Sequence, residues 1–544
     1  MATSTTLPQW QKDSFLPGGL AGLKREATET KETDTDIEAR LKNLRGRSMS
    51  PDEFRELMAR LENVRARSLR FEWIGEVQDF GRRGFAVPKG TYDLASEALD
   101  LSRHSLGSFE SAWRSLAQER VAGLLKTSPG HAWYLGRLRV PVPELPPGWP
   151  WSNKIYMSLE HEMALYSICY KFTYEELKAA DDFGKAVQLW DNLERAGASR
   201  NPRELDDLER GLPTPSVDTM LHVASEAGPE AFREHLAWKA GLLGRGSLTM
   251  AKLLTVPGNP PAPVSPKKSL ATVISLFRGF DPALGDLAAR VQEEGRLSMD
   301  SPSGRTEVAS FTFPAPPGEA PWVYSEQLAG YKSVFALARQ LMKAAYLMAA
   351  GPAGALQFIP SGPMMEAAGS FAETLLFRAL MDEEKRPERR KALACLYMGE
   401  AYDRCVSDAT LAVFHQESFR SLGSLGEREG ITDFLVMHYR KLLSRQLGDM
   451  VAYPKGVYSI PLLTHHLAKP HMHYDRVFGS LLAFALWERY ESKGAAFVPK
   501  FLRILSRGGS ASPQDILAEA GMGPLDEKFW RGCLKVAEKF TGCV

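Results

Sequence analysis

The sequence has few cysteines, and their spacing does not indicate a disulfide framework. The 544 residues include five cysteines, and none of them form a Cys-x-x-Cys pair. An odd, scattered set argues against a small disulfide-stapled protein and against a cysteine-based zinc site. We expect Cys395 and Cys405, which lie in apolar surroundings with helical periodicity, to be core residues.

The chain also lacks a long apolar run. The most apolar tract, 344–365, is interrupted by Pro352, Pro360 and Pro363, and no stretch reaches the roughly 18 apolar residues of a membrane-spanning helix. The N-terminus has no basic segment followed by an apolar one, so no signal peptide is visible. We therefore predict a soluble, cytoplasmic protein without a membrane partner.

Neither sign of charge dominates. There are 67 basic and 66 acidic residues, which leaves a net charge of +1. This balance argues against nucleic acid as a partner. Phosphate-binding loops, dinucleotide fingerprints and a Gly-x-Ser-x-Gly elbow are absent as well.

The patterns that are present are mainly helical. Ser50, Pro51 and Glu53 form a capping box with proline at the first helical position, before a predicted helix at 54–67. The threonine-rich stretch 28–36 predicts a loop. The only clear strand signal is a hairpin formed by 307–313 and 322–324.

Two predicted helices, 335–346 and 364–373, carry the most informative pattern. The first has apolar residues close to a 3.6-residue period and ends before Gly351-Pro352. It resembles the first active-site helix of the oligoendopeptidase F branch of the thimet-type zinc metallopeptidases, which reads roughly Val-Phe-Thr-Leu-Ala-His-Glu-Leu-Gly-His-Ala. The second resembles that family's next helix, roughly Ala-Glu-Val-Ala-Ser-Thr-x-x-Glu. The resemblance spans nearly the whole chain and is most specific after residue 280.

The centre of the zinc motif does not match the family. Arg339, Gln340 and Lys343 stand where the resemblance places the first histidine, the glutamate and the second histidine. Two histidines at i and i+4 share one Zn²⁺ from one face of a helix, and the glutamate is the general base for metal-bound water. Charged arginine and lysine cannot ligate a metal, and an amide cannot accept a proton at neutral pH.

Other family positions are retained. The resemblance matches Glu366 to the third zinc ligand and Glu373 to a residue that orients a ligand position. It matches His466 and Tyr474 to the groups that stabilise the oxyanion of the tetrahedral intermediate. Arg339 and Lys343 have two open interpretations: they replace the charge of zinc and bind Glu366 or a peptide carboxylate, or they only fill the emptied ligand pocket.

The resemblance implies a mainly α fold, a large two-lobed helical body with a small β-sheet beside a central channel. We expect an N-terminal helical lobe at 1–212 and a peptidase-like C-terminal lobe at 213–544. The resemblance also implies that an extended peptide lies along the sheet, so we expect a peptide or peptide-like ligand in the channel between the lobes.

Two functional hypotheses follow. The first is a catalytically degenerate protein without zinc or another cofactor, which binds a peptide and does not hydrolyse it. The alternative is a repurposed or residual enzyme with an atypical metal or acid–base site around Glu366. Its ligands would come from a histidine cluster at His465, His466, His471 and His473, and zinc is expected only in that case.

Overall fold

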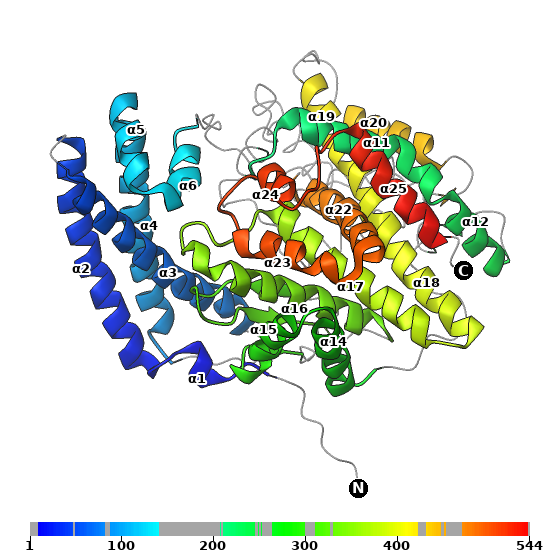
Figure 1. Cartoon of the computed structure of the whole chain (residues 1–544), viewed down its shortest axis with the longest axis horizontal. Coiled ribbons are helices and arrows are strands. Elements are labelled where there is room, and N and C mark those ends of the chain that lie inside the picture. The colour runs from blue at the N-terminus through cyan, green and yellow to red at the C-terminus, as the bar shows by residue number, and fades with distance from the viewer. Residues whose placement is uncertain are drawn as a thin grey trace, which may run out of the picture. The chain divides into compact units, whose positions relative to one another are not determined.

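The computed structural model confirms the prediction of a mainly α protein (Figure 1). The structure describes residues 9–46, 49–81, 88–140, 207, 210–244, 248–249, 252, 264–299, 310–326, 330–422, 431–447, 451–452 and 471–541. In these residues, no helix is both long enough and apolar enough to cross a membrane.

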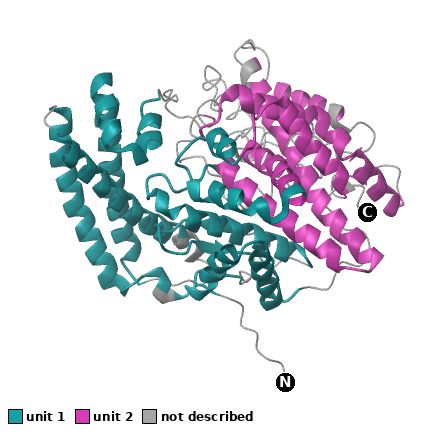
Figure 2. Cartoon of the chain, viewed as in Figure 1, with its two compact units in different colours: residues 1–141, 262–361, 492–520 teal, residues 142–261, 362–491, 521–544 magenta. Residues whose placement is uncertain are grey.

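The chain forms two compact units, each built from three separate segments (Figure 2). Unit 1 comprises residues 1–141, 262–361 and 492–520, and unit 2 comprises 142–261, 362–491 and 521–544. These boundaries differ from the lobe boundary at residue 212 that we expect from the sequence, which remains a prediction.

Unit 1 contains a group of N-terminal helices and a second group of helices that packs against a small sheet. The N-terminal group consists of α1 (Lys12–Phe15), α2 (Gly19–Arg45), α3 (Pro51–Gly81), α4 (Thr91–Arg114), α5 (Gln118–Thr127) and α6 (Ala132–Arg137). The second group consists of α14 (Pro266–Phe280), α15 (Pro282–Glu293), α16 (Lys332–Ala350), α23 (Val498–Arg507) and α24 (Pro513–Glu519). Helix α4 packs on α2 and α3, and α16 packs on α14, α15 and α23.

Local signals explain where several of these helices begin. The backbone N–H of Glu53 donates to Ser50 Oγ at 3.3 Å, and the backbone N–H of Ser50 donates to Glu53 Oε2 at 2.6 Å, so the predicted capping box is confirmed. Asp281 caps α15 through the N–H of Leu284 at 3.1 Å. Ser512 caps α24 in the same way.

The predicted loop at 28–36 is wrong, because these residues lie inside α2. Four threonine hydroxyls in this stretch donate to the backbone carbonyl four residues earlier, as Thr30 does to Glu26 at 2.8 Å. A threonine hydroxyl can disrupt a helix by competing for the hydrogen bonds of the backbone. Here each hydroxyl bonds to a carbonyl of its own helix instead, so the helix continues. Thr30 is fully buried, so this part of α2 also faces the core.

The predicted hairpin is confirmed at 311–313 and 322–324, whereas residues 307–309 of its first strand lie outside the described residues. Strand β3 (Phe311–Phe313) pairs antiparallel with β4 (Trp322–Tyr324), with Thr312 opposite Val323. No sequence pattern predicts the third strand, β2 (Leu297–Ser298), which pairs parallel with β4. The order β2-β4-β3 leaves β3 at an edge of this sheet, and α16 packs against β3 and β4.

Unit 2 is a bundle of long helices. It contains α11 (Thr214–Ala231), α12 (Arg233–Leu242), α17 (Gly362–Glu383), α18 (Pro387–Tyr402), α19 (Asp408–Leu422), α20 (Ile431–Leu447), α22 (His471–Lys493) and α25 (Glu527–Thr541). A π-helical turn, Asp403–Ser407, joins α18 to α19. The short strands β1 (Leu248–Thr249) and β5 (Val451–Ala452) pair parallel. Helix α11 packs on α19, α20 and α25.

The predicted core cysteines are confirmed. Cys395 on α18 and Cys405 in the π-helical turn are both buried. Burial raises the pKa of Cys395 to about 11 and that of Cys405 to about 12. Both thiols are therefore protonated at neutral pH and unsuited to nucleophilic or metal chemistry.

Candidate functional site

Two helices carry the residues that the family resemblance identifies, and each helix is described within its own unit. Helix α16 of unit 1 carries Arg339, Gln340 and Lys343, and helix α17 of unit 2 carries Glu366 and Glu373. Both helices extend beyond their predicted cores at 335–346 and 364–373, so the periodicity located them correctly.

In unit 1, the edge strand of the sheet holds Gln340. The Gln340 side-chain amide donates from Nε2 to the carbonyl oxygen of Ser310 at 3.1 Å. The Thr312 hydroxyl lies 2.9 Å from both the backbone carbonyl oxygen and the side-chain Oε1 of Gln340, and its single proton is donated to one of them at a time. The carboxamide therefore uses its donor and its acceptor to join α16 to β3.

Two cationic residues flank Gln340 on the same helix. Arg339 is buried, with 9% of its surface exposed, and Lys343 is half-buried. Their spacing of four residues places them one above the other on one face, about 6 Å apart along the helix axis. Met342 stands where the family helix has glycine, and it is fully buried. This segment thus presents two positive side chains and a neutral amide.

In unit 2, Glu366 lies where α17 and α22 approach each other closely. A Cβ atom on Gly479 of α22 would lie 2.5 Å from Glu366 Cβ and 2.8 Å from the backbone nitrogen of Ala367. Only glycine permits this separation, because real Cβ contacts are longer. Gly479 therefore determines how closely α22 lies beside Glu366.

Glu373, two turns further along α17, forms a buried ion pair with Arg404 in the π-helical turn. Arg404 Nη2 lies 3.2 Å from Glu373 Oε1, and its Nη1 contacts the other carboxylate oxygen. Arg404 also lies 3.6 Å from Glu400. Burial disfavours the charged guanidinium, but the Glu373 and Glu400 carboxylates outweigh it and raise the pKa of Arg404. The fork-like guanidinium thus fixes the Glu373 side chain.

The π-helical turn also organises polar groups from α22. Arg476 Nε lies 3.0 Å from Asp408 Oδ2, and Arg476 Nη2 lies 3.4 Å from Asp403 Oδ2. Asp408 Oδ1 lies 3.3 Å from Nδ1 of His473. Burial, and then the neighbouring Asp408 charge, raise the pKa of Asp403. Single π-turns inside helices are frequent at functional sites, because they re-aim side chains.

Tyr474 and Asp475 follow directly on α22. Arg210 donates from Nε to Asp475 Oδ1 at 2.8 Å, and its guanidinium lies 5.8 Å from the centre of the Tyr474 ring. Asp475 also approaches the start of α17 closely, since a Cβ on Gly362 would clash with its carboxylate. Tyr474 is fully buried.

The predicted histidine cluster is described only in part. His465 and His466 lie outside the described residues. His471 begins α22, but its side chain is not described, and His473 contacts Asp408. Among the side chains that the structure describes, no group of three histidine, cysteine, aspartate or glutamate residues is arranged to hold a metal ion.

The structure adds residues that sequence reasoning missed. Arg404 and Asp408 are distant in sequence from Glu373 and His473, and no spacing rule joins them. Arg210 likewise precedes Asp475 by 265 residues. Gly479 carried a weak signal as an isolated glycine within an apolar helical pattern, which often marks a close helix contact.

Comparison with known proteins defines the class of fold. No family model matches the sequence, and no curated protein matches it. Solved structures do match, and they show the mainly α fold of the oligoendopeptidase F-like peptidases.

Three of these structures illustrate the extent of the similarity. A Chlamydophila abortus protein provisionally assigned as a peptidase has 12% identity and a TM-score of 0.70, covering 99% of each chain. Pz peptidase A with an inhibitor has 12% identity and a TM-score of 0.68, covering 94% of this chain and 97% of its own. Oligoendopeptidase-F from Enterococcus faecium has 12% identity and a TM-score of 0.57, covering 95% of this chain and 98% of its own.

Proposed function

We propose that this protein is a catalytically degenerate member of the oligoendopeptidase F-like group, which binds a peptide or peptide-like ligand and does not hydrolyse it. The ligand would lie in the channel between two lobes that the family resemblance implies. The protein would act as a binding or regulatory component rather than as a hydrolase.

The observation that carries this proposal is the set of side chains on α16. A catalytic zinc site needs neutral imidazole or anionic donors, whereas Arg339 and Lys343 are cationic. A general base needs a free lone pair that accepts a proton, whereas the Gln340 amide is neutral and hydrogen-bonded to Ser310 and Thr312. These residues do not fit a hydrolytic zinc centre.

The retained residues support a binding role. Arg404 holds Glu373 in a defined position, and Gly479 keeps α22 close to Glu366. These contacts keep two family positions in place on α17. Strand β3 is the edge of its sheet, and an edge strand can pair with an extended peptide backbone.

A second candidate function is residual acid–base catalysis. The contact between His473 and Asp408 favours it, because a carboxylate at Nδ1 orients an imidazole and makes it a better base. On this alternative, Glu366 and the histidine cluster would form an atypical site, with or without a metal.

The proposal is tested by rebuilding the motif. The triple variant Arg339→His, Gln340→Glu, Lys343→His restores the family's donor set and base. We expect it to bind about one zinc ion per chain and to cleave a short quenched-fluorescent peptide, whereas the wild type does neither. If the folded triple variant binds no zinc, the assignment of Glu366 as a third ligand is wrong.

Two matched variants separate metal binding from catalysis. Arg339→His, Lys343→His keeps Gln340, so we expect zinc binding with cleavage at least about 100-fold slower than in the triple variant, because the general base is missing. Arg339→Gln, Lys343→Gln removes both charges without adding donors, so we expect neither zinc binding nor cleavage.

Binding is tested directly with the wild-type protein and a fluorescent decapeptide of mixed sequence. We expect a rise in anisotropy without any cleaved product after prolonged incubation. Product formation that an Asp408→Asn substitution abolishes would instead support the acid–base alternative.

A further inference from the structure

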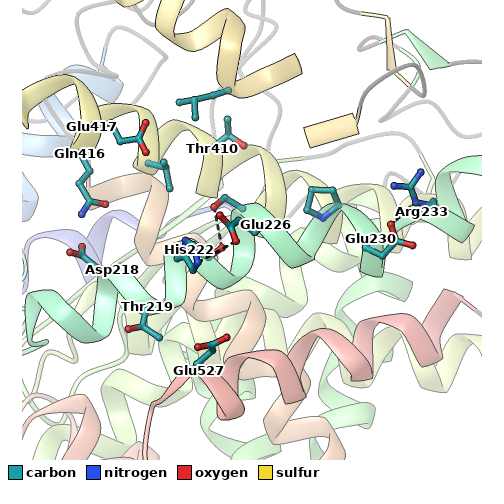
Figure 3. Close-up of a pocket in the computed structure, with 14 residues that line it drawn as sticks. Asp218, Thr219, His222, Glu226, Glu230, Arg233, Thr410, Gln416, Glu417 and Glu527 are labelled. Carbon is teal, nitrogen blue, oxygen red and sulfur yellow. Dashed lines mark hydrogen bonds and ion pairs between the residues drawn. The ribbon is translucent and has the colours of Figure 1, made fainter. Parts of the chain in front are cut away.

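A polar cavity in unit 2 lies apart from the residues discussed so far. It has a volume of about 810 Å³ and lies among α11, α19, α20 and α25 (Figure 3). Its acidic lining residues are Asp218, Glu226, Glu230, Glu417 and Glu527. Against these five carboxylates, the lining contributes one guanidinium, from Arg233, and one imidazole, from His222. The cavity is therefore strongly acidic in a protein whose net charge is only +1.

Three of the five carboxylates lie in a line along α11, and Glu417 and Glu527 come from α19 and α25. Asp218, His222, Glu226 and Glu230 recur every four residues along α11, so they share one face of the helix, as Figure 3 shows. Each step of four residues advances about 6 Å, so the line extends over about 18 Å. A metal ion needs oxygen ligands that converge within about 2.6 Å of one point. This line suits a ligand with several separated positive charges.

Gln416 is a second and independent indication of a ligand. Its side chain extends from α19 into the cavity, toward the α11 face that carries Asp218 (Figure 3). Only 7% of Gln416 is exposed, and its amide forms no hydrogen bond with any residue that the structure describes. The amide faces the cavity, and because a glutamine side chain has both a donor and an acceptor, it can hydrogen-bond to a ligand there.

Two ion pairs that the structure describes inside the cavity are weak competitors for a ligand. His222 lies 3.2 Å from Glu226, and both side chains are more than 60% exposed. Arg233 lies 2.6 Å from Glu230 in a similarly exposed pair. Exposed pairs of this kind contribute about 0.2–1 kcal/mol each. Apolar groups of Pro229, Val413 and Leu442 also line the cavity and suit the methylene groups of a flexible cation.

We propose that this cavity binds a linear ligand with two or more ammonium groups on flexible alkyl chains. The carboxylate line pairs with the ammonium groups, Gln416 accepts a hydrogen bond from one of them, and the apolar lining contacts the spacers. Both free polyamines and the lysine side chains of an extended peptide have this chemistry. The proposal does not rest on the proposed function.

Calorimetric titration of the full chain tests the proposal, with spermidine in one arm and a lysine-glycine-glycine-lysine peptide in the other. We expect at least one probe to bind at low ionic strength and to bind more weakly as salt is added, because salt screens exposed charges. The probe that binds identifies the source of the ligand. Absence of binding in both arms overturns the proposal.

Matched variants make the test specific to the cavity. Glu226→Gln, Glu230→Gln removes two cavity carboxylates, and we expect about tenfold weaker binding. Glu388→Gln, Glu491→Gln removes two exposed carboxylates elsewhere in unit 2, and we expect unchanged binding. Gln416→Leu weakens binding about fivefold without changing its salt dependence, because it removes a neutral acceptor. Equal effects of the two carboxylate pairs would show that only diffuse charge is involved, and would overturn the assignment.

Discussion

At the scale of single residues, the buried pair of Glu373 and Arg404 is the best-defined interaction near the candidate site. The side chains of Arg404 and Glu373 are 15% and 6% exposed, so the pair is largely removed from water. Removing one member leaves the other charge buried and uncompensated. The unpaired buried charge destabilises the folded protein by several times more than the intact ion pair stabilises it.

We predict that Arg404→Met and Glu373→Leu each lower the free energy of unfolding by about 3–5 kcal/mol, whereas the double variant loses much less than the sum. Urea unfolding of the full chain, followed by circular dichroism, measures the three variants against the wild type. Additive losses in the double variant would contradict a direct ionic contact.

His235 is a buried titratable group on α12. Its side chain is 1% exposed, and neither ring nitrogen has a hydrogen-bond partner among the described residues. Burial, and then the charge of Lys239, lower the pKa of His235 from 6.5 to about 3. The unfolded chain therefore binds a proton below about pH 6.5 that the folded chain does not bind, so stability falls as the pH falls from 6.5 towards 3.

We predict that acidification from about pH 7 to about pH 5 lowers the stability of the wild type by about 2 kcal/mol more than that of His235→Leu. Thermal unfolding across this range measures the difference in slope. His104→Leu is a control of opposite sign, because a hydrogen bond from the His104 ring to the Asp34 carboxylate raises the pKa of His104. If the His235→Leu and wild-type slopes coincide, His235 is not buried in its neutral form.

The sequence motif predicted which residues occupy the candidate positions, but it did not predict most of the contacts that these residues make. The motif spacing located Arg339, Gln340 and Glu373 on the helices where the structure places them. The partner of Glu373 lies 31 residues away in a π-helical turn. No local pattern announces such a turn, because it depends on how α18 and α19 pack in the bundle.

At the scale of elements, helix periods and caps were the reliable signals. The capping box and the apolar stripes predicted α3, α16 and α17. Composition alone misled at 28–36, where threonines bond back to the backbone and face the core. Strand β2 has only two residues and pairs parallel with β4, so its alternation is too short to detect.

Gly479 offers a test of the contact between α17 and α22. We predict that Gly479→Ala lowers the free energy of unfolding by about 1–3 kcal/mol, because its Cβ would overlap the backbone at Glu366. Gly532→Ala is a control in α25, where a Cβ meets nothing within 4 Å. We expect it to stabilise by about 0.5–1 kcal/mol, because alanine is the better helix former. A Gly479→Ala protein with the same free energy of unfolding as the wild type would contradict the close contact between α17 and α22.

At the scale of the whole molecule, the chain interleaves three segments in each of its two units. Sequence patterns find helices one at a time, and they carry no signal for which distant segments share a core. The exchange between units occurs at residues 141, 261, 361, 491 and 520. The flanks of α16 and α17 indicated the resemblance to oligoendopeptidase F-like proteins, and the structure shows that similarity of fold along nearly the whole chain at 12% identity.

The central claim is that this peptidase-like fold does not carry a hydrolytic zinc centre. The most direct test is elemental analysis of the full-length wild-type protein after expression with added zinc and removal of loosely bound metal by gel filtration. We predict far less than one zinc ion per chain in the wild type, and the same low zinc content in Glu366→Gln. About one zinc ion per chain in the wild type, lost in Glu366→Gln, would contradict the account.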